Sequence, residues 1–182
     1  MRHVLALALA AAGFLTAAPA FSGEAPKTLA AGDPAPAFSL PGSDGTTHAL
    51  ADHAGKRVVV VAWFPKVFTG GCTAECKSLR ESASEIRAFD AAYFAASVDP
   101  VGPVAEFAKS LEADFPILAD ADGSVARAYG VVTSDRPRPF RWTFYVGKDG
   151  RLLYVDREVK AATAGPDIAK RLAELGVAKK GQ

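Results

Sequence analysis

The segment 58–64 reads VVVVAWF and is apolar at every position up to Pro65. A strand with one face in water alternates apolar and polar residues, whereas a strand covered on both faces shows a continuous run like this one. Segments 91–98 (AAYFAASV) and 115–118 (FPIL) have the same character. We therefore expect three strands buried inside a sheet that carries helices on its faces.

Helical patterns fill the gaps between these strands. One helix is expected over residues 72–89 and another over 103–112, where Pro103 suits a helix start. The second helix has apolar residues at helical spacing, which predicts that one side packs on the sheet. The order strand, helix, strand, helix, strand implies right-handed parallel crossovers.

The pattern changes after residue 140. Segments 141–146 (RWTFYV) and 151–155 (RLLYV) flank the turn GKDG, which predicts an antiparallel hairpin. An amphipathic helix follows, with Pro166 near its start and Gly176 as its C-terminal cap. Together these elements predict an α/β fold of the thioredoxin type, with a mixed sheet flanked by helices.

The chain before residue 58 also has recognisable sequence patterns. Residues 1–20 have a short basic start, an apolar run and a small-x-small site, so we expect a cleaved signal peptide, with an uncleaved membrane anchor as the lesser alternative. An extended lead-in over 21–32, rich in Ala, Pro and Gly, then precedes one domain over 33–178. FSL (38–40) and THAL (47–50) predict a small additional hairpin.

These features predict an exported protein, periplasmic or secreted, that has no membrane anchor after signal cleavage. The formal net charge is +1, and neither sign forms a long block. Nucleic-acid binding is therefore not expected.

The chain has only two cysteines, Cys72 and Cys76. A disulfide between residues so close in sequence removes little entropy from the unfolded chain, so it would be a poor structural staple. Gly70 and Gly71 should let the chain turn sharply out of the preceding strand, which puts Cys72 in the first helical turn. Free N–H groups and the helix dipole favour a thiolate there, and the thiolate is the nucleophilic form.

Helical spacing puts both sulfur atoms on the core-facing side of this helix. In an intact helix, Cβ atoms four residues apart are roughly 5–6 Å from each other, whereas a disulfide needs about 3.8 Å. We expect either a reactive pair with a local opening step, or one reactive thiol beside a packed one.

Two motifs near the ends of these strands resemble those of a known family. PKVFTGGC (65–72) is similar to the peroxiredoxin motif of proline, three residues, threonine, two residues and cysteine. RWTF (141–144) is similar to the family's arginine-x-threonine-phenylalanine strand. The resemblance covers nearly the whole chain after residue 33. It lies with the bacterioferritin-comigratory subgroup of the alkyl hydroperoxide reductase and thiol-specific antioxidant family.

The resemblance implies a role for each matching residue. Cys72 would be the peroxidatic thiolate that attacks the peroxide O–O bond and becomes a sulfenic acid. Thr69 would hydrogen-bond the thiolate and the peroxide, and Pro65 would shield the site from bulk water. Arg141 would stabilise the charge that moves to the leaving oxygen, and Glu75 would support the arginine.

The implied function is a thiol peroxidase that reduces hydrogen peroxide and organic hydroperoxides without a metal, haem or flavin cofactor. An external thiol reductant, such as a thioredoxin-like protein, would close the cycle. Two positions depart from the family pattern. Gly70 stands where many relatives have proline, and Lys77 occupies the usual resolving position. Cys76, one residue earlier, is then either a shifted resolving thiol or a bystander.

A copper-binding protein of the Sco type is the alternative. That family shares the exported thioredoxin fold and a cysteine, three residues, cysteine site in a similar FT context, and two thiolates suit Cu(I). It completes its metal site with a downstream histidine, however, and this chain has none after His53.

Overall fold

β3 (Val58–Trp63) is the central strand of the sheet, and all its residues are buried. It pairs in parallel with β4 (Ala91–Ser97) and antiparallel with β6 (Trp142–Val146). β5 (Ile117–Ala119) and β7 (Leu152–Asp156) complete the order β5-β4-β3-β6-β7. The mixed sheet of the thioredoxin type predicted from the sequence is confirmed.

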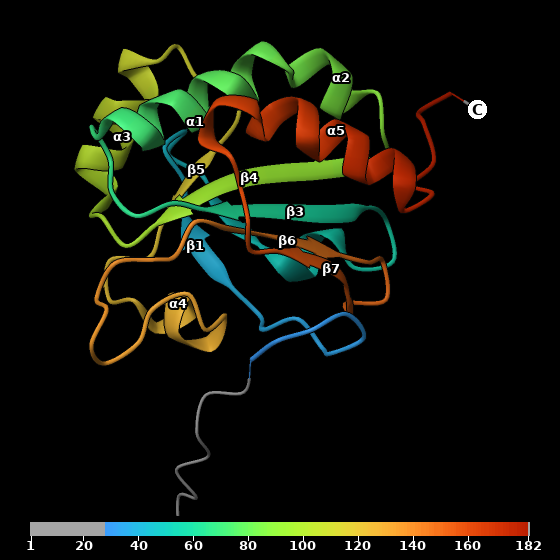
Figure 1. The fold of residues 1–182 in the computed structure, drawn as a ribbon, viewed down its shortest axis with the longest axis horizontal. Coiled ribbons are helices and arrows are strands. Elements are labelled where there is room, and N and C mark those ends of the chain that lie inside the picture. Colours follow the sequence, from blue (N-terminus) through green and yellow to red (C-terminus); the bar gives the residue numbers. More distant parts are fainter. Residues whose placement is uncertain (1–27, 182) are drawn as a thin grey trace, which may run out of the picture.

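The helices cover the two faces unequally. One face carries α1 (Gly70–Glu81), α2 (Ala83–Arg87), α3 (Val101–Ser110) and α5 (Ala164–Glu174), while α4 (Ser124–Ala128) lies on the other (Figure 1). Two clusters of buried apolar side chains result, and β3 sends alternate residues into each of them. This double burial is the physical reason for the continuous apolar run in the sequence.

The shorter elements complete the fold. The predicted N-terminal hairpin is present as β1 (Ser39–Pro41) paired antiparallel with β2 (Thr47–Ala49). Single 3₁₀ turns follow β2 and precede α5, as η1 (Leu50–His53) and η2 (Ala161–Thr163). Gly176 ends the last helix in a left-handed conformation, with φ of 68°, so the predicted cap is confirmed.

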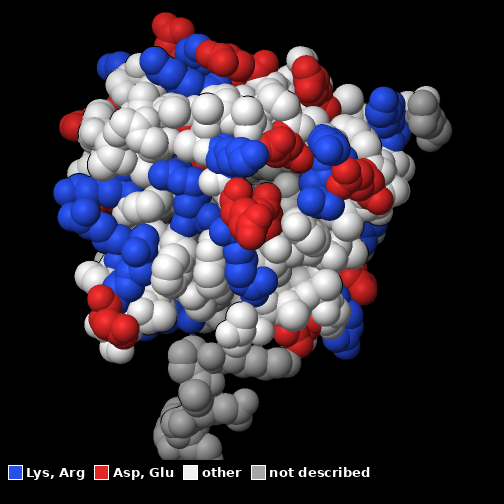
Figure 2. Space-filling model, viewed as in Figure 1, with Lys and Arg blue, Asp and Glu red and all other residues white. Residues whose placement is uncertain are grey.

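The computed structural model describes residues 28–181, so the predicted signal peptide (1–20) and most of the lead-in (21–32) lie outside the described residues. No helix within 28–181 is long and apolar enough to cross a membrane. Much of the face seen in Figure 2 is uncharged; Lys and Arg side chains gather on its left and centre, and Asp and Glu side chains lie mainly at the top, in the centre and on the right.

The helix predicted over 72–89 begins earlier and is divided in two at Ser82. At this point α5 approaches closely, because the backbone N–H of Gly165 donates to the hydroxyl of Ser78 at 3.0 Å. A Cβ atom at Gly165 would lie 2.1 Å from the carbonyl oxygen of Ser78 and 2.7 Å from the hydroxyl of Ser82. The C-terminal half of α1 is thus anchored on α5 through backbone contact that only glycine permits.

The sequence did not predict α4. With only five residues it is too short to show a helical period. Its start is held instead by Asp120, whose carboxylate accepts hydrogen bonds from the backbone N–H groups of Ala126 at 2.6 Å and Val125 at 3.4 Å. The DADGS segment (120–124) is the signal that could have indicated this turn and helix start.

Gly165→Ala should destabilise the protein by several kcal/mol, on the order of 2–4 kcal/mol, because the added methyl group clashes with backbone rather than with a movable side chain. Gly102 of α3 is the matched control, since it is likewise the second residue of its helix and has open space around its Cβ position. Gly102→Ala should be neutral or stabilising by up to about 1 kcal/mol. Urea denaturation measures both, and equal effects would contradict the close packing of α1 on α5.

Candidate active site

The site forms where the central strand ends. Residues 64–69 lead from β3 into α1, so Cys72 lies at the carboxyl edge of the sheet. β6 runs antiparallel to β3, and Trp142 pairs with Trp63. The start of β6 therefore lies beside the end of β3, and this register brings Arg141 next to a helix that is remote from it in sequence.

Arg141 makes two contacts in this corner of the molecule. Its Nη2 atom donates to the Sγ atom of Cys72 at 3.4 Å, and its Nη1 atom forms an ion pair with Oε2 of Glu75. Three of the residues predicted from the sequence thus come together. The Cys72 sulfur atom therefore lies against a guanidinium cation and within the first turn of α1, at the positive end of the helix dipole.

Thr69 and Pro65 lie in the loop that precedes the helix. The Thr69 hydroxyl donates to the carbonyl oxygen of Lys66 at 3.0 Å, and no hydrogen bond from it to Cys72 is present in the described residues. Thr69 is exposed and Pro65 is partly exposed. Both residues are close to Cys72 in the chain, but the loop's own hydrogen bond holds the threonine side chain.

The sharp turn into the helix is not made by the double glycine, so this part of the sequence prediction was wrong. Phe68 is the residue in the left-handed region, with φ of 58°, and it is 57% exposed. Gly70 and Gly71 already belong to α1. Gly71 matters for another reason, because a Cβ atom there would lie 3.1 Å from Nη2 of Arg141. Glycine at this position gives the guanidinium room to reach the sulfur atom.

The loop formed by residues 64–69 is also held by a residue that was not predicted from the sequence. The carboxylate of Asp99 accepts a hydrogen bond from the backbone N–H of Val67 at 2.9 Å. Asp99 lies just after β4, so this bond fixes the loop to the neighbouring strand. The signal in the sequence was the acidic residue of SVDP (97–100), which comes where a buried strand ends.

Glu75 is the most unusual group in the site, because only 1% of its surface is exposed. Burial raises the pKa of its carboxyl to about 7, although the Arg141 guanidinium acts in the opposite direction. Its Oε1 atom has no hydrogen-bond partner among the described residues. A carboxyl that changes its charge near neutral pH therefore lies beside Cys72.

Both cysteines are free thiols in this structure, and both are fully buried on the side of α1 that faces the core. Burial raises the pKa of the Cys76 thiol, and the nearby Glu75 and Cys72 raise it further. Cys76 is therefore a thiol as long as the helix is intact. The two sulfur atoms share one helix face, as the spacing predicted.

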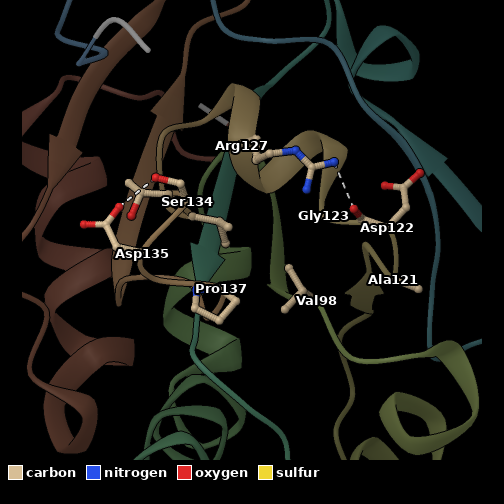
Figure 3. A pocket seen from close by; sticks show the side chains of 10 residues that line it. Val98, Ala121, Asp122, Gly123, Arg127, Ser134, Asp135 and Pro137 are labelled. Atoms are coloured by element: carbon tan, nitrogen blue, oxygen red, sulfur yellow. Dashed lines mark hydrogen bonds between the residues drawn. The ribbon is translucent and has the colours of Figure 1, made fainter. Parts of the chain in front are cut away.

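Within residues 28–181, no group of three or more His, Cys, Asp and Glu side chains is arranged to hold a metal ion. The same edge of the sheet also carries a hollow of about 950 Å³, between the start of α4 and the loop that leads to Arg141 (Figure 3). Val98 and Pro137 lie on its walls, and Arg127 donates to the carbonyl oxygen of Asp122 at 3.0 Å. Neither cysteine lines this hollow.

A thioredoxin-type sheet with a cysteine in the first turn of a helix, in contact with an arginine that directly precedes a neighbouring strand, defines a thiol peroxidase of the peroxiredoxin class. The chain belongs to the AhpC/TSA family, whose model matches residues 31–155. The resemblance based on PKVFTGGC and RWTF is thereby confirmed.

Individual relatives agree with this assignment. A putative peroxiredoxin of Mycobacterium tuberculosis (strain H37Rv) is 32% identical over 155 residues, which are 82% of this chain and 96% of the relative. Peroxiredoxin Bcp of Escherichia coli (strain K12) is 31% identical over 140 residues, or 74% of this chain and 89% of Bcp. The crystal structure of peroxidoxin BcpB from M. tuberculosis matches with a TM-score of 0.72 and 31% identity, covering 80% of this chain and 97% of BcpB.

The buried carboxyl predicts how stability changes with pH. Because the pKa of Glu75 is raised from 4.5 to about 7, the folded protein binds more protons than the unfolded chain between these values. The free energy of unfolding of the reduced wild type should therefore fall relative to that of Glu75→Gln as pH rises through this interval. Between about pH 5 and about pH 8 the relative loss should be about 2.5 kcal/mol. Urea denaturation of both proteins at about pH 5 and about pH 8 measures it, and a difference that does not change with pH would contradict the assignment.

Proposed function

We propose that this peroxiredoxin reduces hydrogen peroxide and organic hydroperoxides through Cys72, with Cys76 as its resolving thiol. The observation that carries the proposal is the contact between Arg141 and the Cys72 sulfur at the start of α1. A thiolate there is stabilised by a cation and by the helix start, and the same cation can stabilise the oxygen that leaves the peroxide. Bacterioferritin comigratory protein of Xanthomonas campestris, 26% identical with a TM-score of 0.68, is described in connection with alkyl peroxide reduction activity.

In the first step the Cys72 thiolate attacks the nearer oxygen of the peroxide. An S–O bond forms as the O–O bond breaks, so Cys72 is oxidised to a sulfenic acid and the peroxide is reduced to water or an alcohol. Arg141 stabilises the charge on the leaving oxygen. Thr69 would bind the peroxide once its hydroxyl turns from the Lys66 carbonyl, and Pro65 would limit the entry of water.

In the second step Cys76 attacks the sulfenic acid, water leaves, and a disulfide joins Cys72 and Cys76. The helical separation of their Cβ atoms is too long for this bond, so the first turn of α1 must open. Several features support opening at this end. The turn contains Gly70 and Gly71, which weaken a helix by up to about 1 kcal/mol each, and Thr69 makes no side-chain capping hydrogen bond.

Contacts further along α1 would confine this opening to the first part of the helix. Ser78 and Ser82 are held against Gly165 of α5, which anchors the C-terminal part of α1. Cys76 lies between the weak first turn and this anchor. A short rearrangement would therefore bring the sulfur atoms together while the rest of the helix stays packed, and an external dithiol protein of the thioredoxin kind would then reduce the disulfide.

The proposed location is outside the cytoplasm, in the periplasm or the medium. The argument rests on the basic start, the apolar run and the Ala18-Pro19-Ala20 site within residues 1–20. An exported thiol peroxidase needs a reductant in the same compartment, because cytoplasmic dithiols do not reach it.

Intact mass spectrometry of the protein recovered from the exported fraction tests the main proposals together. Loss of residues 1–20 should be seen directly. After one equivalent of hydrogen peroxide the reduced protein should lose two hydrogen atoms, and peptide mapping should find a bond between Cys72 and Cys76. Cys76→Ser should gain oxygen on Cys72 instead, and Cys72→Ser should have no peroxidase turnover. Near-normal activity of Cys72→Ser would overturn the proposal, whereas oxygen gain on wild-type Cys72 would remove only the resolving role.

Substitutions of Arg141 and of Gly71 should both slow the reaction of Cys72 with peroxide. Arg141→Ala should slow it by about 10²-fold or more, since a preorganised cation is lost. Gly71→Ala should slow it less, because its methyl group displaces the guanidinium by only a few tenths of an ångström, and Gly70→Ala, with open space at its Cβ position, serves as the matched control. Stopped-flow tryptophan fluorescence measures the step. Equal rates for the two glycine variants would show that Gly71 does not make room for Arg141.

A further inference from the structure

The site contains one cation and two buried acids. Arg141 contacts both Cys72 and Glu75, each through a different nitrogen of the same guanidinium. Cys76, on α1, is the other titratable group coupled to them. Within residues 28–181, no second Lys, Arg or His side chain is in ion-pair or hydrogen-bond contact with either acid.

This charge count limits how many protons the site can release. If Cys72 and Glu75 were both ionised, a buried site with one guanidinium would have a net negative charge, which is costly away from water. One proton shared between the two acids leaves the site neutral, because one positive and one negative charge then remain. The proton can reside on Glu75 at Oε1, the carboxyl oxygen that forms no hydrogen bond with any described group.

We propose that Glu75 takes the proton that Cys72 loses when it becomes a thiolate, and gives this proton to the oxygen that leaves the peroxide. The proposal rests on the proposed function. First, Cys72 thiol and Glu75 carboxylate become Cys72 thiolate and Glu75 carboxylic acid. The thiolate electron pair then forms the S–O bond, the O–O bond breaks, and its electron pair stays on the leaving oxygen, which takes the Glu75 proton to become water or an alcohol.

The same charge count also favours the transfer of the proton from Glu75 to the leaving oxygen. Once the thiolate has become a neutral sulfenic acid, Arg141 faces only one acid, and the carboxylate form of Glu75 is favoured. The two acids are bound to neighbouring ends of one guanidinium, so an oxygen leaving beside Cys72 and Arg141 is close to the carboxyl group. The raised pKa of Glu75, about 7, suits a group that both accepts and releases a proton near neutral pH.

Proton counting tests the proposal. The Cys76→Ser protein stops at the sulfenic acid, and it is compared with the Glu75→Gln/Cys76→Ser protein, whose amide has nearly the same shape but cannot release a proton. Both are mixed with one equivalent of hydrogen peroxide in weak buffer with a pH indicator, under conditions where ultraviolet absorbance shows Cys72 as thiolate. The Glu75→Gln protein should take up more protons from the solvent, with an excess that approaches one per sulfenic acid at about pH 6 and vanishes by about pH 9. Ionisation of the sulfenic acid is common to both proteins and cancels in the difference.

Infrared spectroscopy gives a second measurement of the Glu75 protonation state, and it does not depend on the reaction rate. The infrared band of a protonated carboxyl should be present in the reduced Cys76→Ser protein, disappear on oxidation, and be absent from the Glu75→Gln protein. Equal proton counts in the two proteins, or no change in this band, would overturn the proposal while leaving Cys72 as the peroxidatic residue. Failure of the Cys76→Ser protein to form any sulfenic acid would instead refute the proposed function itself.

Discussion

The antiparallel pairing of β6 with β3 determines where the chemistry of this protein can occur. β3 is buried on both faces, so its position in the sheet is fixed by the two apolar clusters that it joins. Its register with β6 sets the start of that strand, and with it Arg141, beside the end of β3. Cys72 then needs only to lie in the first turn of the helix that follows β3. The reactive contact is thus a consequence of strand pairing in the core.

The helix that carries both cysteines is held unevenly along its length. Its first turn has two glycines and no side-chain cap, and it follows a phenylalanine in a left-handed conformation. Its far end is fixed to α5 through Gly165. Local opening energies vary along any folded chain, and elements that move in function belong to the weakly held part. The distribution of contacts along α1 fits the proposed cycle, in which the two thiols change their separation.

The electrostatics of the site depend on a single guanidinium group that contacts two acidic side chains. Arg141 contacts both the Cys72 sulfur atom and the buried Glu75 carboxyl. A change in the charge of one of these groups therefore alters how strongly the guanidinium stabilises the charged form of the other. In the proposed cycle, oxidation of the Cys72 thiolate removes one negative charge without adding a cation. A single guanidinium can therefore couple thiol oxidation to the protonation of Glu75.

The sequence by itself determined the fold class and the order of the strands along the chain, and it singled out Cys72, Glu75 and Arg141, which the structure brings together. Apolar runs give buried strands a strong signal, and the PKVFTGGC and RWTF motifs indicated Cys72 and Arg141 as members of one site. The sequence could not give the division of the helix at Ser82 or the short helix α4, because close backbone approach and a five-residue helix leave no periodic pattern. It also misplaced the turn before α1, since a left-handed phenylalanine is rare enough that glycine is the usual expectation. Only the tertiary structure decided that Glu75 is buried with one free oxygen, that Gly71 leaves room for the guanidinium, and that one cation serves two acids, because these properties arise from packing between segments far apart in the chain.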